Sequence, residues 1–468
     1  MRRISLYFQI HQPFRLRRYR FFDIGNDHYY YDDYLNESIL RKVAEKSYLR
    51  TNDVLLGLLE RYEGFSVAFS VTGIALEQFA LYAPEVLESF RRLAVHPRVE
   101  FLAETYAHSL ASLVSREEFV RQVNEHKKAL KEHFGVTPRV FRNTELIYSD
   151  EIGAMVADMG FEGILTEGAK HVLGWKSPNY LYCNSINPRL KVLLKNFKMS
   201  DDIAFRFSDR NWDEWPLTAG KFAGWLREIP REEEIVGLFM DYETFGEHQW
   251  EETGIFEFLK ALPGEVLNTT DFVFTTPTEA VRELQPVAEI SVPHPISWAD
   301  EERDLTAWLG NELQDEAFRK LYAMEEKIRK IKAPDIRKDW NYLQASDHFY
   351  YMCTKFFSDG AVHSYFNPYD SPYDAFINFM NVLSDFEIRV NAAYAEKEGS
   401  PEVVRLNKLL KEKEKEIRAY EEELKKYRTG KPSATARKKT LAKKSAGKKS
   451  SRPSQAKGGR KRSSSSGK

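Results

Sequence analysis

The sequence predicts an α/β fold in which a barrel of parallel strands is followed by a mostly helical region. Over the first 285 residues, short apolar runs alternate with stretches of helical periodicity. Repeated strand–helix units favour a parallel sheet, and seven or eight of them favour a closed barrel. Polar side chains follow most of these runs, as expected of functional residues at the carboxyl ends of barrel strands.

Eight apolar runs are the predicted strands, because they are short and rich in β-branched and aromatic residues. They span residues 4–10, 65–71, 99–103, 139–141, 162–166, 191–197, 235–240 and 272–276. The helices between them have recognisable ends. Ser115 and Glu118 have the spacing of a capping box, and the helix after Ser149 is expected to stop at Gly160.

The chain is expected to divide into four parts. They are a barrel over 1–285 with an insertion at about 12–60, a helical region over 286–395 packed on the barrel, a helical arm over 401–428, and a disordered tail over 430–468. The arm has a heptad pattern that only Lys413 interrupts, so it either pairs as a coiled coil or docks on its own body. The tail is rich in Lys and Ser and lacks the apolar residues needed for a core.

The net charge of −1 hides an asymmetry along the chain. The tail holds 14 of the 69 Lys and Arg residues and none of the 70 Asp and Glu residues, which leaves the remainder with a net charge of −15. Such a body is a poor nucleic-acid binder by itself and suits a neutral substrate, whereas the tail either contacts polyanions or only solvates the protein.

The compartment is predicted from the cysteines and the apolar segments. Cys183 and Cys353 are the only cysteines, too few for a disulfide framework. No apolar run is long enough to span a membrane, and the first residues do not resemble a signal peptide. We therefore expect a cytoplasmic protein without a membrane contact.

Six predicted strands end in polar residues that would share one rim of the barrel. These residues include His11, Glu104, His108, Arg142, Glu145, Glu167, Asp201, Asp202 and Asp241. Carboxylates and aromatic rings suit sugars, and hydrolysis of a glycosidic bond needs two carboxyl groups. The loop tryptophans Trp175, Trp212, Trp215 and Trp250 are candidate stacking platforms.

A metal site is the alternative for the histidines of this rim. His11, His108, His248 and His348 include three that could converge on an ion, but no HExxH, HxH or paired-cysteine spacing occurs. We therefore expect no metal and no other cofactor, and we interpret His11, His108 and His248 as sugar contacts.

Five motifs carry a resemblance to glycoside hydrolase family 57. In chain order they are FQIHQP (8–13), AETYAHS (103–109), FRNTELIYSD (141–150), MDYETFGEHQW (240–250) and ASDHFYYM (345–352). The chain most resembles the α-amylase-type members over about residues 1–390. The resemblance implies an incomplete (β/α)7 barrel followed by a helical region, so one of the eight predicted strands is expected to be peripheral.

The resemblance also implies roles for individual residues. Glu145 matches the nucleophile and Asp241 the general acid/base of a retaining enzyme. His11 and Glu104 fall where the family places substrate-binding groups, and Asp347 and His348 fall in the fifth motif. Glu243 is expected to point away from Asp241 and to have a structural role. The two catalytic carboxyl groups are expected to lie about 5–5.5 Å apart.

The predicted function is hydrolysis of α-1,4-glucan, such as starch, glycogen or maltooligosaccharides. A 4-α-glucanotransferase would use the same two carboxylates. More remote alternatives are a metal-dependent polysaccharide deacetylase and a non-catalytic glycan-binding protein. Chain-length preference, α-1,6 tolerance and oligomeric state stay open at this point.

Overall fold

The computed structural model describes residues 1–355, 367–398 and 401–428. The chain forms two compact units, Met1–Tyr394 and Ala395–Lys468. Within the second unit, α18 (Pro401–Arg428) is a single helix. The predicted tail over 430–468 lies outside the described residues. The predicted division into four parts and the pairing of the arm stay predictions.

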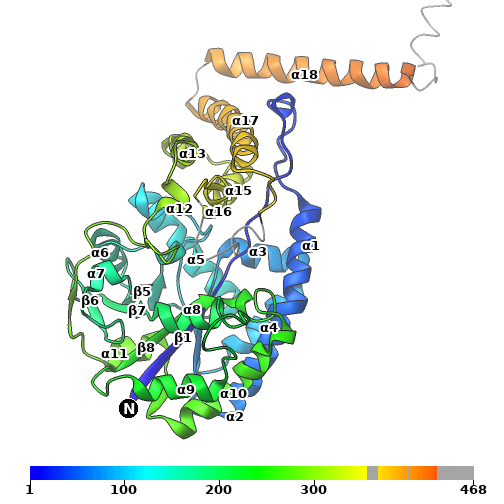
Figure 1. The fold of residues 1–468 in the computed structure, drawn as a ribbon. Coiled ribbons are helices and arrows are strands. Elements are labelled where there is room, and N and C mark those ends of the chain that lie inside the picture. Colours follow the sequence, from blue (N-terminus) through cyan, green and yellow to red (C-terminus); the bar gives the residue numbers. More distant parts are fainter. Residues whose placement is uncertain (356–366, 399–400, 429–468) are drawn as a thin grey trace, which may run out of the picture. The chain divides into compact units, whose positions relative to one another are not determined.

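Seven parallel strands close a barrel in the first unit (Figure 1). They are β1 (Arg2–Ile10), β2 (Val67–Val71), β3 (Val99–Phe101), β4 (Val140–Arg142), β5 (Gly163–Glu167), β7 (Lys191–Lys195) and β8 (Ile235–Asp241). Strands β3 and β4 meet through the bridge Ala103–Phe141, and β7 meets β8 through the pair Lys195–Gly237. The (β/α)7 barrel implied by the resemblance is therefore confirmed, although β3 and β4, and β7 and β8, are each joined at a single residue pair.

Three further strands lie outside the ring. β9 (Phe272–Phe274) is the predicted strand that proves peripheral, since it pairs only with the first residues of β1. β6 (Tyr182–Asn184) and β10 (Ala288–Ile290) were not predicted. They read YCN and AEI, so neither carries the run of β-branched and aromatic residues by which the other strands were predicted.

Alternation along the strands sorts side chains between the barrel interior and the helices outside. In β8, Phe239 belongs to the interior cluster, while Leu238 and Met240 pack with the surrounding helices. Because strand side chains repeat every two residues, Asp241 falls on the interior side with Phe239. It lies opposite Gln9 of β1. The register thus places a carboxyl group at the rim of the barrel.

The barrel strands alternate with helices. Those around the barrel are α1 (Asp33–Val43), α2 (Leu49–Arg61), α3 (Gly73–Tyr82), α4 (Pro84–Ala94), α5 (Arg116–Phe134), α6 (Asp150–Asp158), α7 (Lys170–Leu173), α8 (Phe197–Ala204), α9 (Ala219–Glu228), α10 (Ile255–Thr269) and α11 (Pro277–Glu283). Helix α6 has Ser149 as its N-cap and ends just before Gly160, as predicted. The capping box of α5 forms only in part, because the Glu118 carboxylate bonds Arg121 and Trp340 instead.

A helical cap lies beyond the carboxyl ends of the strands, on the side opposite the N-terminus (Figure 1). It contains α12 (Thr306–Leu309), α13 (Glu312–Tyr322), α14 (Glu325–Lys330), α15 (Pro334–Leu343), α16 (Ser346–Tyr350) and α17 (Pro372–Glu398). The amide N of Ser346 donates to the carbonyl O of His108 at 2.9 Å, which joins α16 to the loop after β3. Two buried tryptophans, Trp308 and Trp340, pack the cap into the same apolar cluster as Phe141 of β4.

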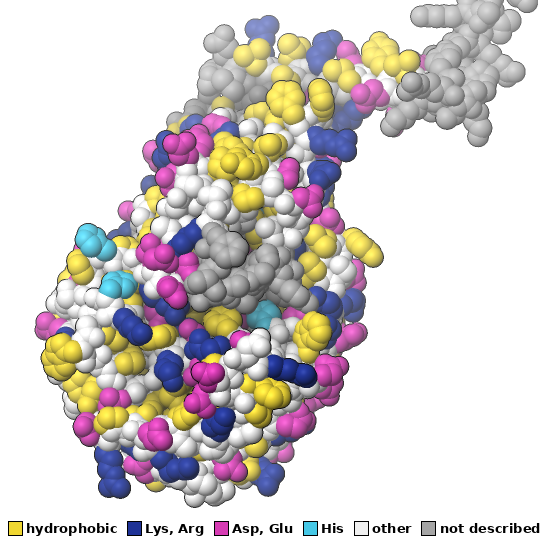
Figure 2. All heavy atoms as spheres, viewed as in Figure 1, with side chains coloured by type: hydrophobic (Ala, Val, Ile, Leu, Met, Phe, Trp, Pro, Cys, Tyr) yellow, Lys and Arg dark blue, Asp and Glu magenta, His cyan; other side chains and the backbone are white. Residues whose placement is uncertain are grey.

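Among the described residues, no helix combines the length and apolar character needed to cross a membrane. Acidic, basic and apolar side chains are interspersed over the face shown in Figure 2.

Candidate active site

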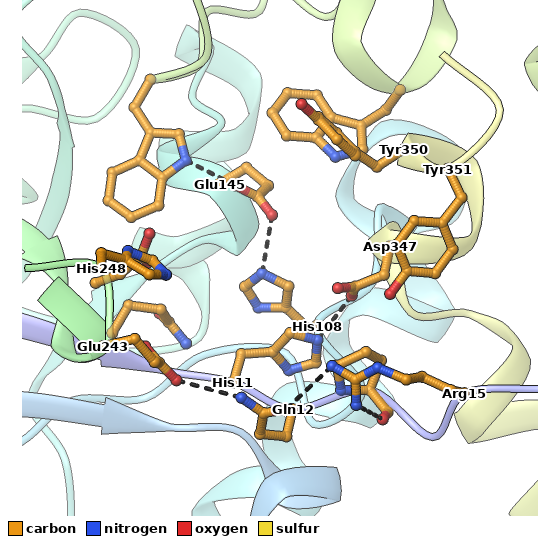
Figure 3. A pocket seen from close by; sticks show the side chains of 15 residues that line it. His11, Gln12, Arg15, His108, Glu145, Glu243, His248, Asp347, Tyr350 and Tyr351 are labelled. Carbon is orange, nitrogen blue, oxygen red and sulfur yellow. Dashed lines mark hydrogen bonds and ion pairs between the residues drawn. The ribbon is translucent and has the colours of Figure 1, made fainter. Parts of the chain in front are cut away.

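One pocket opens where the carboxyl ends of β1, β4 and β8 meet the helical cap (Figure 3). It is lined by Gln9, His11, Gln12, Pro13, Arg15, His108, Glu145, Asp241, Glu243, His248, Trp298, Trp308, Asp347, Tyr350 and Tyr351. A neighbouring pocket, lined in part by Lys195, Asp201 and Asp300, shares Asp241, His248 and Trp298 with the first. The two hollows thus adjoin around Asp241.

Glu145 lies directly after β4, in a tight turn that fixes its direction. Its φ of 56° and ψ of 26° are left-handed, a conformation that costs energy for a residue with a Cβ. Trp298 Nε1 donates to Oε2 of Glu145 at 2.7 Å, and His108 Nε2 lies 3.1 Å from Oε1. Ser346 Oγ donates to Oε1 at 3.4 Å. Each carboxylate oxygen of Glu145 is therefore held by a donor of the protein.

His108 lies between two carboxyl groups. Its Nδ1 is 3.4 Å from Oε2 of Glu104, and its other ring nitrogen faces Glu145. Burial acts to lower the pKa of His108, but the hydrogen bonds to Glu104 and Glu145 raise it to about 9. At neutral pH the ring is therefore an imidazolium.

His11 stacks on His108, with ring centroids 4.0 Å apart and planes inclined by 20°. Burial and the positive charge of His108 lower the pKa of His11 below its usual value. Its Nε2 lies 2.8 Å from Oδ2 of Asp347 and its Nδ1 3.0 Å from Oγ1 of Thr72. Burial acts to raise the pKa of Asp347, but His11 lowers it overall. The pair therefore consists of a neutral His11 and an ionised Asp347.

Asp241 and Glu243 both line the pocket. The expectation that Glu243 points away from Asp241 was made for a strand that continues. The strand instead ends at Asp241, Tyr242–Thr244 form a 3-10 turn, and both carboxyl groups line the pocket. Glu243 is buried, accepts a hydrogen bond from the Tyr48 hydroxyl and another from Gln12 Nε2 at 3.4 Å (Figure 3). Burial and the charge of Asp241 raise the pKa of Glu243 to about 8.

Two residues predicted to bind substrate lie outside the pocket lining. Glu104 is fully buried beneath His108. His348 is buried against Phe379, and its Nε2 lies 3.1 Å from the carbonyl O of Tyr342. Burial lowers the pKa of His348 to about 4, so the ring is neutral.

The predicted stacking tryptophans also lie outside both pockets. Trp212 packs against Trp225 at a centroid distance of 6.1 Å. Trp215, Trp250 and Trp175 are exposed, at 42%, 56% and 93% of their surface. Lys46 Nζ lies 5.8 Å from the ring centroid of Trp250. Any contact of these rings with a substrate would be with sugar units beyond the pocket.

Sequence reasoning missed Trp298, which lines both pockets and holds Glu145. The Trp298 carbonyl accepts a hydrogen bond from Arg303, whose guanidinium also donates to Asp201 Oδ2 at 3.2 Å. Lys195 Nζ donates to Asp201 Oδ1 at 2.7 Å, so a buried ion network lies beneath Trp298. The sequence carries no strand-end signal for Trp298, because it lies in an irregular loop after β10.

Within the part of the chain that the structure describes, no three His, Cys, Asp or Glu side chains are grouped as metal ligands would be. In the pocket, His11 instead bonds a carboxyl group and a hydroxyl, and His108 bonds two carboxyl groups.

The arrangement combines the Glu145 carboxyl group, whose oxygens are held by Trp298, His108 and Ser346, with a second carboxyl group in the same pocket. Two such groups can move a proton and form a bond at one carbon atom, as glycosidases require. Fold and site together are those of a barrel enzyme with several carboxyl groups in its pocket. Residues 5–293 match the model of glycosyl hydrolase family 57, and the chain belongs to this family of glycosidases.

A relative in Methanocaldococcus jannaschii, provisionally named an alpha-amylase, is 44% identical over 408 residues. The match covers 84% of this chain and 86% of that protein.

Solved structures share the fold at low sequence identity. The family 57 branching enzyme from Thermococcus kodakaraensis superposes with a TM-score of 0.61 at 13% identity, over 86% of this chain and 93% of that one. The family 57 branching enzyme from Pyrococcus horikoshii gives 0.57 at 17% identity, over 75% and 86%. The 4-alpha-glucanotransferase from Thermococcus litoralis gives 0.56 at 15% identity, over 74% and 55%.

Proposed function

We propose that the protein is a retaining hydrolase of α-1,4-glucans, with Glu145 as nucleophile and Asp241 as general acid/base. One observation carries this proposal: Glu145 and Asp241 line the same pocket, and both oxygens of Glu145 are fixed by Trp298 and His108. The name of the Methanocaldococcus relative supports the choice of an amylase.

The first step transfers the sugar to Glu145. A carboxylate oxygen of Glu145 attacks the anomeric carbon while Asp241 gives its proton to the departing glycosidic oxygen. The new C–O bond forms as the old one breaks. The positive charge of His108 beside Glu145 favours the ionised form that this attack requires.

The second step releases the sugar. The Asp241 carboxylate takes a proton from water, whose oxygen attacks the anomeric carbon and frees Glu145. Two inversions give net retention. We expect the two carboxyl groups to lie about 5–5.5 Å apart when substrate is bound.

Asp347 has one oxygen bonded to His11 and lines the pocket, so we propose it as an acceptor for a sugar hydroxyl. His248 lies at the junction of the two pockets, where it can contact the sugar on either side of the scissile bond.

The product profile on maltoheptaose tests hydrolysis against transfer. Hydrolysis increases the number of reducing ends, whereas a 4-α-glucanotransferase gives longer and shorter chains at a constant number. Asp241→Asn should lower kcat by about 10²- to 10⁴-fold, the usual contribution of a general acid. Turnover that survives in Glu145→Gln would refute the assignment of the nucleophile.

Azide separates the two carboxyl roles. On a maltosyl substrate with an activated leaving group, Asp241→Ala should form the α-azide, because azide attacks the glycosyl-enzyme without needing a base. Glu145→Gly should form the β-azide, because azide then replaces the nucleophile. If Asp241→Ala gave the β-azide and Glu145→Gly the α-azide, Asp241 would be the nucleophile and Glu145 the general acid/base.

We also propose a cytoplasmic location, since both Cys183 and Cys353 are free thiols.

A further inference from the structure

Glu104 is a buried acid that the reaction proposed above does not use. Its side chain is fully buried and absent from the pocket lining, so it has no surface to offer a sugar. Gln9 Nε2 donates to both of its oxygens at 3.3 Å, and His108 Nδ1 lies 3.4 Å from Oε2. Glu104 can therefore act on the pocket only through the residues that it bonds.

The orientation of the Gln9 side chain shows that the Glu104 carboxyl group faces hydrogen-bond donors, Gln9 Nε2 and His108 Nδ1. Tyr7 and Ser70 have their hydroxyls 2.9 and 2.8 Å from Oε1 of Gln9, and because the two hydroxyls bond each other at 2.5 Å, one of them donates to the other and the second donates to this oxygen. The Gln9 amide nitrogen must then face Glu104. Burial acts to raise the pKa of Glu104, but the hydrogen bond and charge of His108 lower it overall. Glu104 is therefore an ionised, acceptor-only carboxylate.

His108 completes a chain of three groups. One ring nitrogen faces the Glu104 carboxylate and the other faces Glu145 at 3.1 Å. An imidazole between two carboxylates donates from both nitrogens only when it is doubly protonated. The other charged or titratable groups near the ring are Arg142, whose charge opposes that state, His11, which stacks on it, and Asp347, whose charge favours it.

His11 can lie against a charged ring because it is itself neutral. Its Nε2–H donates to Asp347, which leaves Nδ1 to accept from the Thr72 hydroxyl. The Thr72 oxygen in turn accepts from the amide of Ala75 at 3.2 Å. These contacts, together with the pKa of His11 that burial and the charge of His108 lower, favour one charged and one neutral ring in the stack.

We propose that Glu104 is a positioning residue for the nucleophile: it holds His108 as an imidazolium, which fixes the charge and direction of the Glu145 carboxylate. This inference deepens the proposed function and rests on Glu145 being the nucleophile. With Trp298 on Oε2 and His108 on Oε1, the carboxylate has a donor on each oxygen and cannot rotate freely. Without the Glu104 carboxylate, His108 loses a charged hydrogen-bond acceptor that stabilises the imidazolium, so the ring is expected to lose its second proton.

A double-mutant cycle tests whether Glu104 acts through His108. Glu104→Gln keeps the shape and removes the charge. We expect kcat on maltoheptaose to fall about 10- to 100-fold, as a misdirected reacting group does, with KM changed less than about 2-fold. In a His108→Gln background, the same change should lower kcat by less than about 3-fold. Effects that multiply fully, or a rise in KM at constant kcat, would overturn the proposal.

The ring nitrogens of His108 supply a second measurement, by ¹⁵N NMR of the full chain at neutral pH. The wild-type ring should be doubly protonated, Glu104→Asp should keep that state, and Glu104→Gln should lose it. A singly protonated wild-type ring would overturn the proposal even if Glu104→Gln failed to fold.

Glu100→Gln is the matched control. Glu100 is on β3, the strand that Glu104 follows, and accepts from the amide N of Thr278 at 2.8 Å at the other end of the barrel. It should leave both kcat and the His108 signals unchanged. The proposed function and the role of Glu104 can be refuted separately. Activity in Glu145→Gln refutes the proposed function. If Glu145→Gln is inactive but the effects of Glu104→Gln and His108→Gln on kcat multiply fully, only the role of Glu104 is refuted.

Discussion

Trp298 and Glu145 are joined twice. The indole Nε1 of Trp298 donates to the carboxylate of Glu145 at 2.7 Å, and its amide N donates to the carbonyl O of Glu145 at 3.2 Å. The first contact fixes the carboxylate and the second supports the left-handed backbone that presents it. The loop after β10 therefore helps to direct Glu145, the proposed nucleophile.

Replacing Trp298 with Phe removes the indole donor and keeps an aromatic wall. We expect kcat to fall about 10-fold, since a hydrogen bond to a charged group contributes about 1.5–3 kcal/mol. Because the ring still lines the pocket, KM should change less than kcat. Steady-state kinetics on maltoheptaose measures both.

The control is Trp225→Phe in α9, where the ring packs on Phe222 without an indole hydrogen bond to the site. It should leave kcat unchanged. If Trp298→Phe also leaves kcat unchanged, the indole does not direct Glu145.

Glu243 makes stability depend on pH. Its pKa is raised from 4.5 to about 8 by burial and the charge of Asp241, so the native state binds the proton more tightly than the unfolded state. The native state must therefore lose stability relative to the unfolded state as pH rises from about 4.5 to 8. Glu243→Gln mimics the neutral acid and should escape this loss.

Urea unfolding at pH 5 and pH 9 measures the difference. The variant should match the wild type at pH 5 and exceed it at pH 9 in free energy of unfolding. Parallel curves for the two proteins would show that Glu243 titrates normally.

The barrel could be predicted because its strands are marked twice, by apolar alternation and by the polar residues that follow them. All eight predicted strands are present, while β6 (YCN) and β10 (AEI) were missed because neither carries a run of β-branched and aromatic residues. His11, His108, Glu145, Asp241, His248 and Asp347 were predicted as site residues and line the pocket.

What the sequence could not supply is contact between distant elements. Trp298 reaches Glu145 only because the loop after β10 folds back over β4. Glu104 follows a strand in the same way as Glu145, yet Gln9 and His108 bury it. His348 neighbours Asp347 on α16, but a helix turns adjacent side chains in different directions. A motif places a residue near a site without saying whether it faces the pocket.

Trp250 should matter for long substrates only. It is 56% exposed and lies outside both pockets, although it follows His248 by two residues. A ring there can stack on a sugar unit beyond the pocket. Trp250→Ala should raise KM for maltoheptaose about 3- to 10-fold, a loss of about 1 kcal/mol. It should not change KM for 4-nitrophenyl α-maltoside.

Phe22→Ala removes another exposed ring, at the tip of the insertion after β1, and serves as the control. It should leave both KM values unchanged. Equal effects of Trp250→Ala on the two substrates would place the ring next to the reacting sugar or show a general loss of structure.

Activity should survive exhaustive chelation. The proposed proton transfers and bond changes use Glu145 and Asp241, and among the described residues no three ligating side chains are grouped around an ion. Dialysis against EDTA, with the metal content measured afterwards, should leave kcat on maltoheptaose unchanged. A loss that one divalent ion restores would favour the metal-dependent alternative.

The tail should bind polyanions independently of catalysis. Residues 430–468 carry 14 Lys and Arg and no acid, whereas residues 1–429 have a net charge of −15. Multiple cations release counterions from a polyanion, so the full chain should bind a heparin column and elute at raised salt. A chain ending at residue 429 should flow through with kcat unchanged. Retention of that shorter chain would place the basic site on the body instead.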